Sequence, residues 1–156
     1  MRPLSTRRCP PMPSGAIVVG FDGSGCAFCA LDKAAELARL DGSRVVIVFA
    51  FEIPAAYGGG ETGEYRRAVR QLAEQTAAKG AERAASAGVD YEVDLVPERP
   101  VEGLVHAAER HGASLIVVGT HGEHPLAGAI LGSVPHKLLH VSPVPVLVVP
   151  AGRDEP

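Results

Sequence analysis

The chain lacks several features that would assign it to other classes of protein. Its 156 residues contain no apolar run near the length of about 18 residues that a membrane span needs. The formal net charge is −3 without a basic stripe, so nucleic acid is not expected as the main partner. Three cysteines imply no disulfide framework. With 46% hydrophobic and 21% charged residues, the composition is that of one globular domain of ordinary size.

Signatures of dedicated catalysts are also missing. Neither the phosphate-binding motif G-x-x-x-x-G-K-[ST] nor the nucleophile motif G-x-S-x-G occurs. The segment GFDGSG (20–25) carries glycines, but not in the order of the dinucleotide-binding fingerprint. No carboxylates are paired with recognisable partners. The sequence therefore favours binding, with slow hydrolysis at most, over dedicated catalysis.

The ends of the chain differ in composition from its middle. The segment MRPLSTRRCPPMPSG (1–15) is basic and rich in proline but has no apolar core, unlike a secretory signal. We interpret residues 1–14 as a flexible extension, 15–150 as a single domain and 151–156 as a tail. A cytoplasmic location is the default expectation.

Between these ends, strands and helices alternate. Continuous apolar runs predict buried strands, and apolar residues three or four apart predict helices. The expected strands are 17–20, 45–51, 89–96, 115–119 and 144–149, of which 89–96 alternates and should lie at a sheet edge. The expected helices are 24–40, 64–87, 101–111 and 133–141. This order predicts an α/β fold: an open, doubly wound, five-stranded parallel sheet with helices on both faces.

The most informative stretch is GTHGEHPLAGAILGS (119–133). Gly119, Gly122, Gly132 and Ser133 stand at the spacing G-x2-G-x9-G-S, between an apolar strand and a helix start. Glycines let a backbone approach an anion, and the N–H groups of a helix N-terminus point at it. A serine at the N-cap adds a hydroxyl. Each glycine alone is compatible with a simple turn, but the full spacing predicts a phosphate site.

On these residues the chain resembles the universal stress protein family, in its ATP-binding branch. Three further features are similar: IVVGFDGS (17–24) with an aspartate directly after the strand, VVIVFAF (45–51), and the closing PVPVLVVP (143–150). The resemblance covers about residues 15–150. It implies an ATP-binding regulatory protein of the stress response.

The resemblance also implies a role for each matching position. Asp22 would bond the ribose hydroxyls of ATP. Ala50 would offer backbone groups to adenine, although the family often has Val at this place. The phosphates would be held by Gly119, Gly122, Gly132 and Ser133, with the loop 123–131 folded over them. His121 stands where the family often has Arg and is expected beside a phosphate, more weakly if neutral.

Two expectations concern partners. An Mg²⁺ ion held mainly by the ATP phosphates is compatible with this site. The apolar strand 144–149, if it lies at a sheet edge, should be covered by a second copy of the chain. The resemblance likewise implies a homodimer.

Three alternatives stay open. Cys26 and Cys29 form a C-x-x-C at the start of a helix, a placement typical of redox dithiols but also compatible with two small helix residues. The pairs His121/His124 and His136/His140 have the spacing of metal ligands, yet no further ligand completes either set, so no metal site is expected. Finally, the domain could serve protein interactions without nucleotide.

Overall fold

The computed structural model describes residues 15–53, 62–122 and 131–152. The expected extension 1–14 and the end of the expected tail lie outside these residues. Five strands form one parallel sheet in the order β3-β2-β1-β4-β5, which confirms the predicted fold class. The strands are β1 (Ala16–Gly20), β2 (Arg44–Ala50), β3 (Tyr91–Val96), β4 (Ala113–Gly119) and β5 (Val146–Val149).

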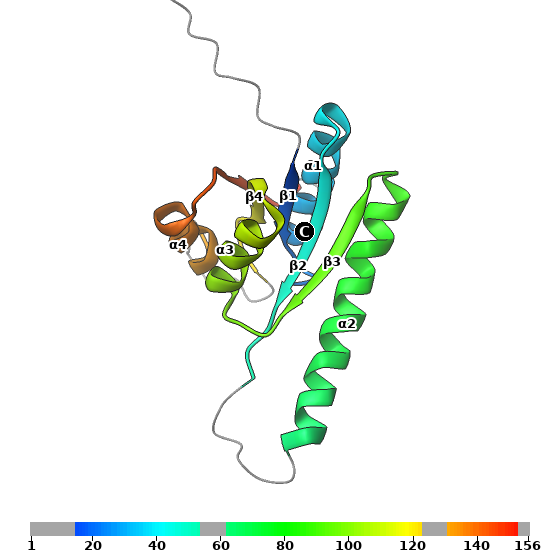
Figure 1. The fold of residues 1–156 in the computed structure, drawn as a ribbon, viewed down its shortest axis with the longest axis vertical. Coiled ribbons are helices and arrows are strands. Elements are labelled where there is room, and N and C mark those ends of the chain that lie inside the picture. The colour runs from blue at the N-terminus through cyan, green and yellow to red at the C-terminus, as the bar shows by residue number, and fades with distance from the viewer. Residues whose placement is uncertain (1–14, 54–61, 123–130, 153–156) are drawn as a thin grey trace, which may run out of the picture.

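Four helices connect the strands and cover both faces of the sheet (Figure 1). They are α1 (Gly25–Asp41), α2 (Thr62–Ser86), α3 (Pro100–His111) and α4 (Ser133–Val141). The first and third stop at Gly42 and Gly112, each in the left-handed conformation that favours glycine. None of the helices in the described ranges is both long and apolar enough to cross a membrane.

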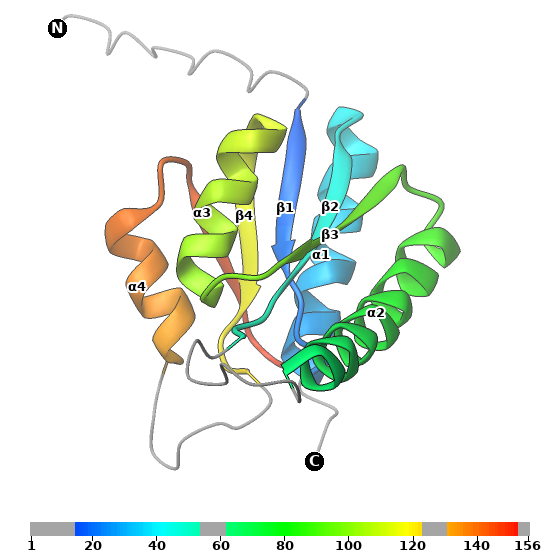
Figure 2. The same ribbon diagram turned by 60° about the horizontal axis from the view of Figure 1, so that its bottom comes forward.

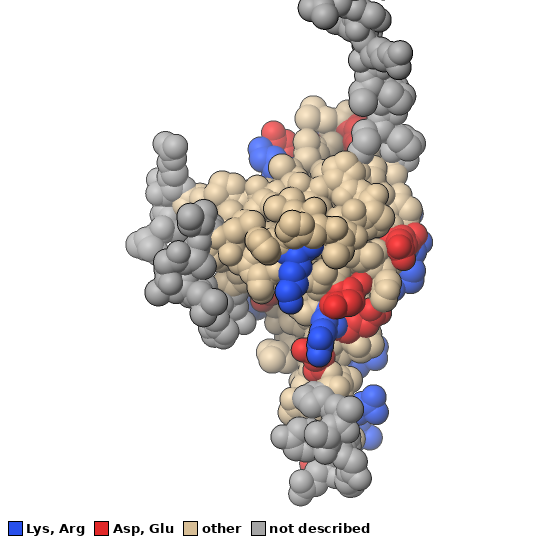
Figure 3. All heavy atoms as spheres, turned by 90° about the vertical axis from the view of Figure 1, so that its left-hand side faces the viewer, with Lys and Arg blue, Asp and Glu red and all other residues tan. Residues whose placement is uncertain are grey.

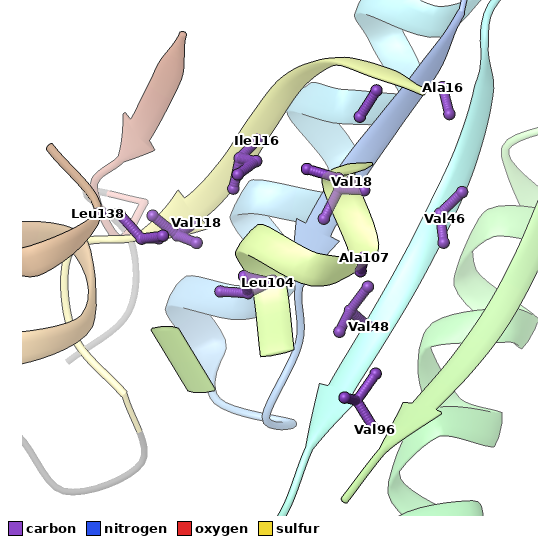
Figure 4. Close-up of a cluster of buried hydrophobic side chains, with 12 residues drawn as sticks. Ala16, Val18, Val46, Val48, Val96, Leu104, Ala107, Ile116, Val118 and Leu138 are labelled. Atoms are coloured by element: carbon purple, nitrogen blue, oxygen red, sulfur yellow. The ribbon is translucent and has the colours of Figure 1, made fainter. Parts of the chain in front are cut away.

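Two cores lie on opposite faces of the sheet because successive strand residues point to opposite sides. On one face, Val18 and Val46 pack with Leu104 of α3 and Leu138 of α4 (Figure 4). On the other, residues such as Ile47 pack against small residues of α1 and α2. Alanines dominate the buried face of α1, which lets this helix lie close to the sheet.

The predicted boundaries are close to the observed ones, with one difference that has a clear physical cause. The expected last strand 144–149 begins only at Val146. Val144 forms a local turn instead, in which its N–H donates to Ser142 Oγ and its carbonyl accepts from the same hydroxyl. Pro145, which follows, has no N–H to donate to a neighbouring strand.

The two edges of the sheet are β3, as predicted, and β5. More important for function, β1 and β4 are neighbours, so the loops that leave their carboxyl ends lie side by side (Figure 2). In open α/β sheets this switch point is where ligands bind.

Candidate nucleotide-binding site

A cavity of about 300 Å³ opens at the carboxyl ends of β1, β2 and β4. Its volume is at the lower end of the range typical of small-molecule sites. All seven site residues expected from the sequence line it, namely Asp22, Ala50, Gly119, His121, Gly122, Gly132 and Ser133. The structure therefore brings together residues from four separate stretches of the chain.

Asp22 lies at the polar end of this cavity, directly after β1. Its Oδ1 accepts a hydrogen bond of 2.9 Å from the N–H of Ser24. The hydroxyl of Ser24 in turn accepts from the N–H of Ala27 and caps α1. These bonds fix the turn between β1 and α1 and hold the carboxylate at the rim of the cavity.

The amino end of α4 forms a second polar wall. The expectation that Ser133 is the N-cap is wrong: Gly132 occupies that position in an extended conformation, and Ser133 is the first helical residue. A cap hydroxyl bonds the N–H two or three positions later. Pro135, two residues after Ser133, has no N–H, which disfavours a cap at 133. The exposed Ser133 hydroxyl is therefore not used to cap the helix.

The same end of α4 presents fewer N–H groups than the sequence suggested. We expected the N–H of Gly132 to face a phosphate, but it donates to Thr120 O over 2.7 Å. The first bond within the helix runs from His136 N to Gly132 O. The N–H groups of Ser133 and Val134 precede that bond, so these two have no partner within the helix and remain to meet an anion.

Packing within the protein also explains the motif glycines. A β-carbon at Gly119 would lie 2.6 Å from Cys26 Cβ and 2.9 Å from the Cys26 carbonyl. One at Gly132 would lie 3.0 Å from Thr120 O, and one at Gly122 would lie 2.9 Å from Asp22 Oδ2. All three positions thus require close approach between segments of the chain itself, besides any approach to a ligand.

Ala50 lies at the apolar end of the cavity, at the last position of β2. Strand backbone groups alternate in direction. Val48 O accepts from Phe21 N on the β1 side, whereas Phe51 N donates to Val96 O on the β3 side. The N–H and C=O of Ala50 therefore face the β1 side, beyond the point where β1 ends.

Sequence reasoning missed the apolar lining. Leu104 from α3, Val118 from β4 and Val134 from α4 form walls of the cavity. Leu104 belonged to the inward stripe of its predicted helix, which gave the signal for burial. The sequence pattern does not distinguish a residue buried in the core from one that lines a cavity, because the difference depends on how α3 packs against the strand ends.

The expected covering loop 123–131 lies almost wholly outside the described residues. Leu131 is described and lines the cavity. His124 of the first histidine pair is outside the described ranges, whereas His121 lines the cavity and is half-buried.

The sequence profile of the Universal stress protein family matches residues 14–150. The chain belongs to this family.

Relatives and solved structures agree with that assignment. Universal stress protein YxiE of Bacillus subtilis is 31% identical over 143 residues, covering 85% of this chain and 97% of the relative. The solved universal stress protein from Archaeoglobus fulgidus is 28% identical with a TM-score of 0.69, covering 86% and 98% of the two chains. A universal stress protein solved in complex with cAMP is also 28% identical, with a TM-score of 0.71 and coverage of 88% and 98%.

In this universal stress protein the residues of the two alternative sites, the redox dithiol and the metal site, can be located as well. Cys26 and Cys29 are free, half-buried thiols on the first turns of α1. His136 and His140 stack edge to face on α4, with ring centroids 5.3 Å apart. Within residues 15–53, 62–122 and 131–152, no three histidine, cysteine or acidic side chains are placed to hold a metal ion.

Proposed function

We propose that this chain binds ATP in the cavity and acts as a nucleotide-linked regulatory protein. The observation that carries the proposal is the convergence of two polar elements on one cavity. The Asp22 carboxylate and the amino end of α4 lie at its rim, while its interior is largely apolar. ATP joins a flat apolar base, a ribose diol and a polyanion in one molecule. These three parts match the apolar interior, the Asp22 carboxylate and the amino end of α4, respectively.

The adenine ring would lie at the apolar end. Leu104 and Val118 offer it aliphatic surface, and the backbone N–H and C=O of Ala50 face this space. A donor and an acceptor side by side suit the edge of a purine. The ring would thereby be held by burial and oriented by hydrogen bonds.

The ribose would lie at Asp22. Its Oδ1 is already engaged by the Ser24 N–H, which fixes the orientation of the carboxylate. Ionised carboxylates accept hydrogen bonds from hydroxyl groups strongly. Asp22 would therefore recognise the sugar rather than the phosphates, which it repels.

The phosphates would lie against the N–H groups of Ser133 and Val134 and against the Ser133 hydroxyl. A helix N-terminus carries partial positive charge, which favours this arrangement. His121 lies on the same cavity and would meet a phosphate most strongly when protonated. A Mg²⁺ ion bound through the phosphates would neutralise part of their charge.

Regulation rather than turnover fits the chemistry of the lining. Among the described residues that line the cavity, Asp22 and His121 are the titratable ones. Asp22 is assigned to the ribose and His121 to holding a phosphate as a cation, which leaves no dedicated base for an attacking water in this arrangement. We therefore infer slow hydrolysis at most. The solved relative in complex with cAMP supports the adenine nucleotide class for this site.

Titration calorimetry with ATP and AMP tests the proposal, after native mass spectrometry for nucleotide that co-purifies. Hydrogen bonds to charged groups contribute about 1.5–3 kcal/mol, so Ser133→Ala should weaken ATP about tenfold or more. AMP should be affected less, because fewer phosphates reach α4. Asp22→Ala should weaken both nucleotides alike. A wild-type chain that binds neither would overturn the proposal and favour an interaction domain without nucleotide.

We propose in addition that two copies pair through β5. This edge strand is wholly apolar in sequence, and its side chains are half-buried in one chain. On the side of the molecule that carries α4, the upper part of the face shows few charged side chains (Figure 3), and Leu139 and Val141 are exposed on that helix. Natural proteins cover apolar strand edges, and a two-fold pairing would do so.

A further inference from the structure

Cys26 and Cys29 lie one turn apart on α1 and are both reduced and half-buried. Residues three apart on a helix share a face. Helix geometry places their Cα atoms about 5 Å apart, within the range of about 4.4–6.8 Å that a disulfide spans. The two sulfurs can therefore be joined without unfolding the helix.

The first of these thiols contacts the nucleotide cavity through one residue. Cys26 Sγ lies 3.7 Å from Thr120 Oγ1, and Thr120 directly follows the first glycine of the motif, Gly119. The carbonyl of the same Thr120 accepts from Gly132 N over 2.7 Å and so holds the amino end of α4. Thr120 thus connects the Cys26 thiol on α1 to the amino end of α4, where the phosphates are proposed to bind.

Packing leaves little freedom at this contact. The backbone of Cys26 lies so close to Gly119 that a β-carbon there would be 2.9 Å from the Cys26 carbonyl. A shift of the first turn of α1 is therefore transmitted to the end of β4, since close-packed elements do not slide past one another freely.

The second thiol, Cys29, lies near the cation of Arg83. Arg83 pairs with Asp32 over 2.7 Å on the exposed side of α1. The hydrogen bond and charge of Asp32 raise the pKa of Arg83, and Cys29 adds a smaller electrostatic contribution. Cys29 therefore faces a different neighbourhood from Cys26, which faces the cavity loops.

We propose that Cys26 and Cys29 form a reversible dithiol–disulfide pair whose oxidation weakens nucleotide binding. The effect on binding rests on the function proposed above; formation of the disulfide does not. The oxidant is a low-molecular-weight disulfide such as oxidised glutathione.

The reaction is two successive thiol–disulfide exchanges. One cysteine, as thiolate, attacks a sulfur of oxidised glutathione, so that a mixed disulfide forms and one glutathione thiolate leaves. The other cysteine attacks the protein sulfur of the mixed disulfide, the Cys26–Cys29 bond forms, and the second glutathione leaves. The two protons lost by the cysteines end on the two glutathione thiols, and the two electrons reduce glutathione.

Oxidation changes the contact with Thr120 directly. A sulfur bonded to Cys29 can no longer donate to the Thr120 hydroxyl and can only accept from it weakly, and its side-chain torsion is fixed by the new bond. The contact of Thr120 with α1 is thereby weakened and displaced, while its carbonyl still has to hold Gly132. We expect the amino end of α4 to be less well ordered in the oxidised protein.

The first experiment tests the disulfide alone. The full chain carries Cys9→Ser, which removes its third cysteine, and is equilibrated in buffers of oxidised and reduced glutathione before intact mass and peptide mapping are recorded. The expected result is a loss of two hydrogens, with one peptide containing the Cys26–Cys29 bond, reversed by excess reduced glutathione. Cys29→Ser in the same background should instead retain a glutathione adduct. If no internal disulfide forms with oxidised glutathione in large excess, the proposal is wrong.

The second experiment tests the link to the cavity. ATP affinity is measured for the reduced and oxidised forms, and we expect it to fall at least fivefold on oxidation. The matched Cys26→Ser variant should show the same affinity in both buffers. Equal affinities of the two wild-type forms would overturn the link.

A readout without nucleotide keeps the two proposals separable. Amide hydrogen exchange of the segment 131–138 should be faster in the oxidised form, because the Gly132–Thr120 bond is loosened. If the reduced protein binds no ATP, the proposed function fails, but this exchange difference still tests the switch. If the exchange of the segment 131–138 is the same in the reduced and oxidised forms, the proposed effect of the disulfide on α4 is wrong.

Discussion

The carboxylate of Asp22 lies directly against Gly122: a β-carbon at position 122 would be 2.9 Å from Asp22 Oδ2. The two residues belong to the loops after β1 and β4, which are 100 positions apart in sequence and neighbours in the sheet. The second glycine of the motif thus makes room for the aspartate of the first loop, and the two loops act as one unit.

Gly122→Ala should therefore damage the ribose end of the site, although Gly122 belongs to the expected phosphate motif. The added methyl group would push the Asp22 carboxylate from its place. Since a hydrogen bond to a charged group contributes about 1.5–3 kcal/mol, ATP and AMP should both bind about tenfold more weakly. Calorimetry with both nucleotides measures this. Gly63→Ala, on an exposed helical position with nothing within 4 Å, is the matched control. A loss of affinity for ATP without a loss for AMP would show that the Gly122→Ala substitution does not act through Asp22.

Gly119→Ala should lower the free energy of unfolding even in the absence of nucleotide. Its β-carbon would meet Cys26 Cβ at 2.6 Å and the Cys26 backbone at 2.9 Å, where α1 cannot move without disturbing its buried alanine face. Overpacking of this kind costs about 1–3 kcal/mol, which urea unfolding would show as a lower midpoint with an unchanged slope. The same measurement on Gly63→Ala should show no loss. Equal stability of Gly119→Ala and wild type would mean that this glycine is needed only for ligand.

The architecture could be predicted because its signals are local. Apolar runs such as 45–51 and the helical stripe at 101–111 each lie within one element, and strand–helix alternation leaves few topologies. The meeting of the loops at Asp22 and Gly122 follows from the strand order, since the adjacent parallel strands β1 and β4 end at one edge of the sheet.

What the sequence could not supply were contacts between distant segments. The bond from Gly132 N to Thr120 O removes a donor that the motif seemed to offer, and it depends on how two loop ends meet. The tight fit of Gly119 on Cys26 likewise depends on the distance between α1 and β4. At Val144, a single hydroxyl from Ser142 outweighed the strand tendency of the apolar run.

Stability towards acid should depend on Asp94, which ties the edge strand β3 to the end of α3. Asp94 Oδ2 accepts from Arg110 Nη2 at 2.7 Å and from His111 Nε2 at 2.9 Å. Burial raises the pKa of Asp94, but the hydrogen bonds and charges of Arg110 and His111 outweigh it and hold the pKa below its ordinary value. A lowered pKa in the folded state means that the stabilisation is present above about pH 4, where the unfolded carboxyl is ionised. It is lost as the pH falls further, through the folded value.

Asp94→Asn should therefore unfold at lower urea than wild type near neutral pH, and the difference should shrink as the pH falls below about 4. Urea titrations at several pH values measure this. Asp90→Asn, at an exposed position just before the same strand, is the control and should follow wild type throughout. A difference for Asp94→Asn that stays constant with pH would show that charge pairing is not its cause.

The proposed dimer can be tested on the backbone of β5, because alternate residues of this strand face opposite ways. Ile116 N donates to Pro145 O and Thr120 N donates to Val149 O, so residues 145 and 149 face β4. By alternation, Val148 directs its N–H away from the sheet, towards a partner strand. Val148→Pro removes that donor without touching the ladder to β4, and proline is tolerated at sheet edges. We expect light scattering at micromolar concentration to show a monomer.

The matched control is Leu147→Pro, one position along. Its N–H lies on the side of β4, so its removal breaks the ladder inside the chain and should lower stability by about 1–3 kcal/mol. Val148→Pro should instead keep near-wild-type unfolding of the single chain and should still bind ATP, since no residue of β5 lines the cavity. If wild type is a monomer, or if Val148→Pro is folded and still dimeric, two copies do not pair through this edge.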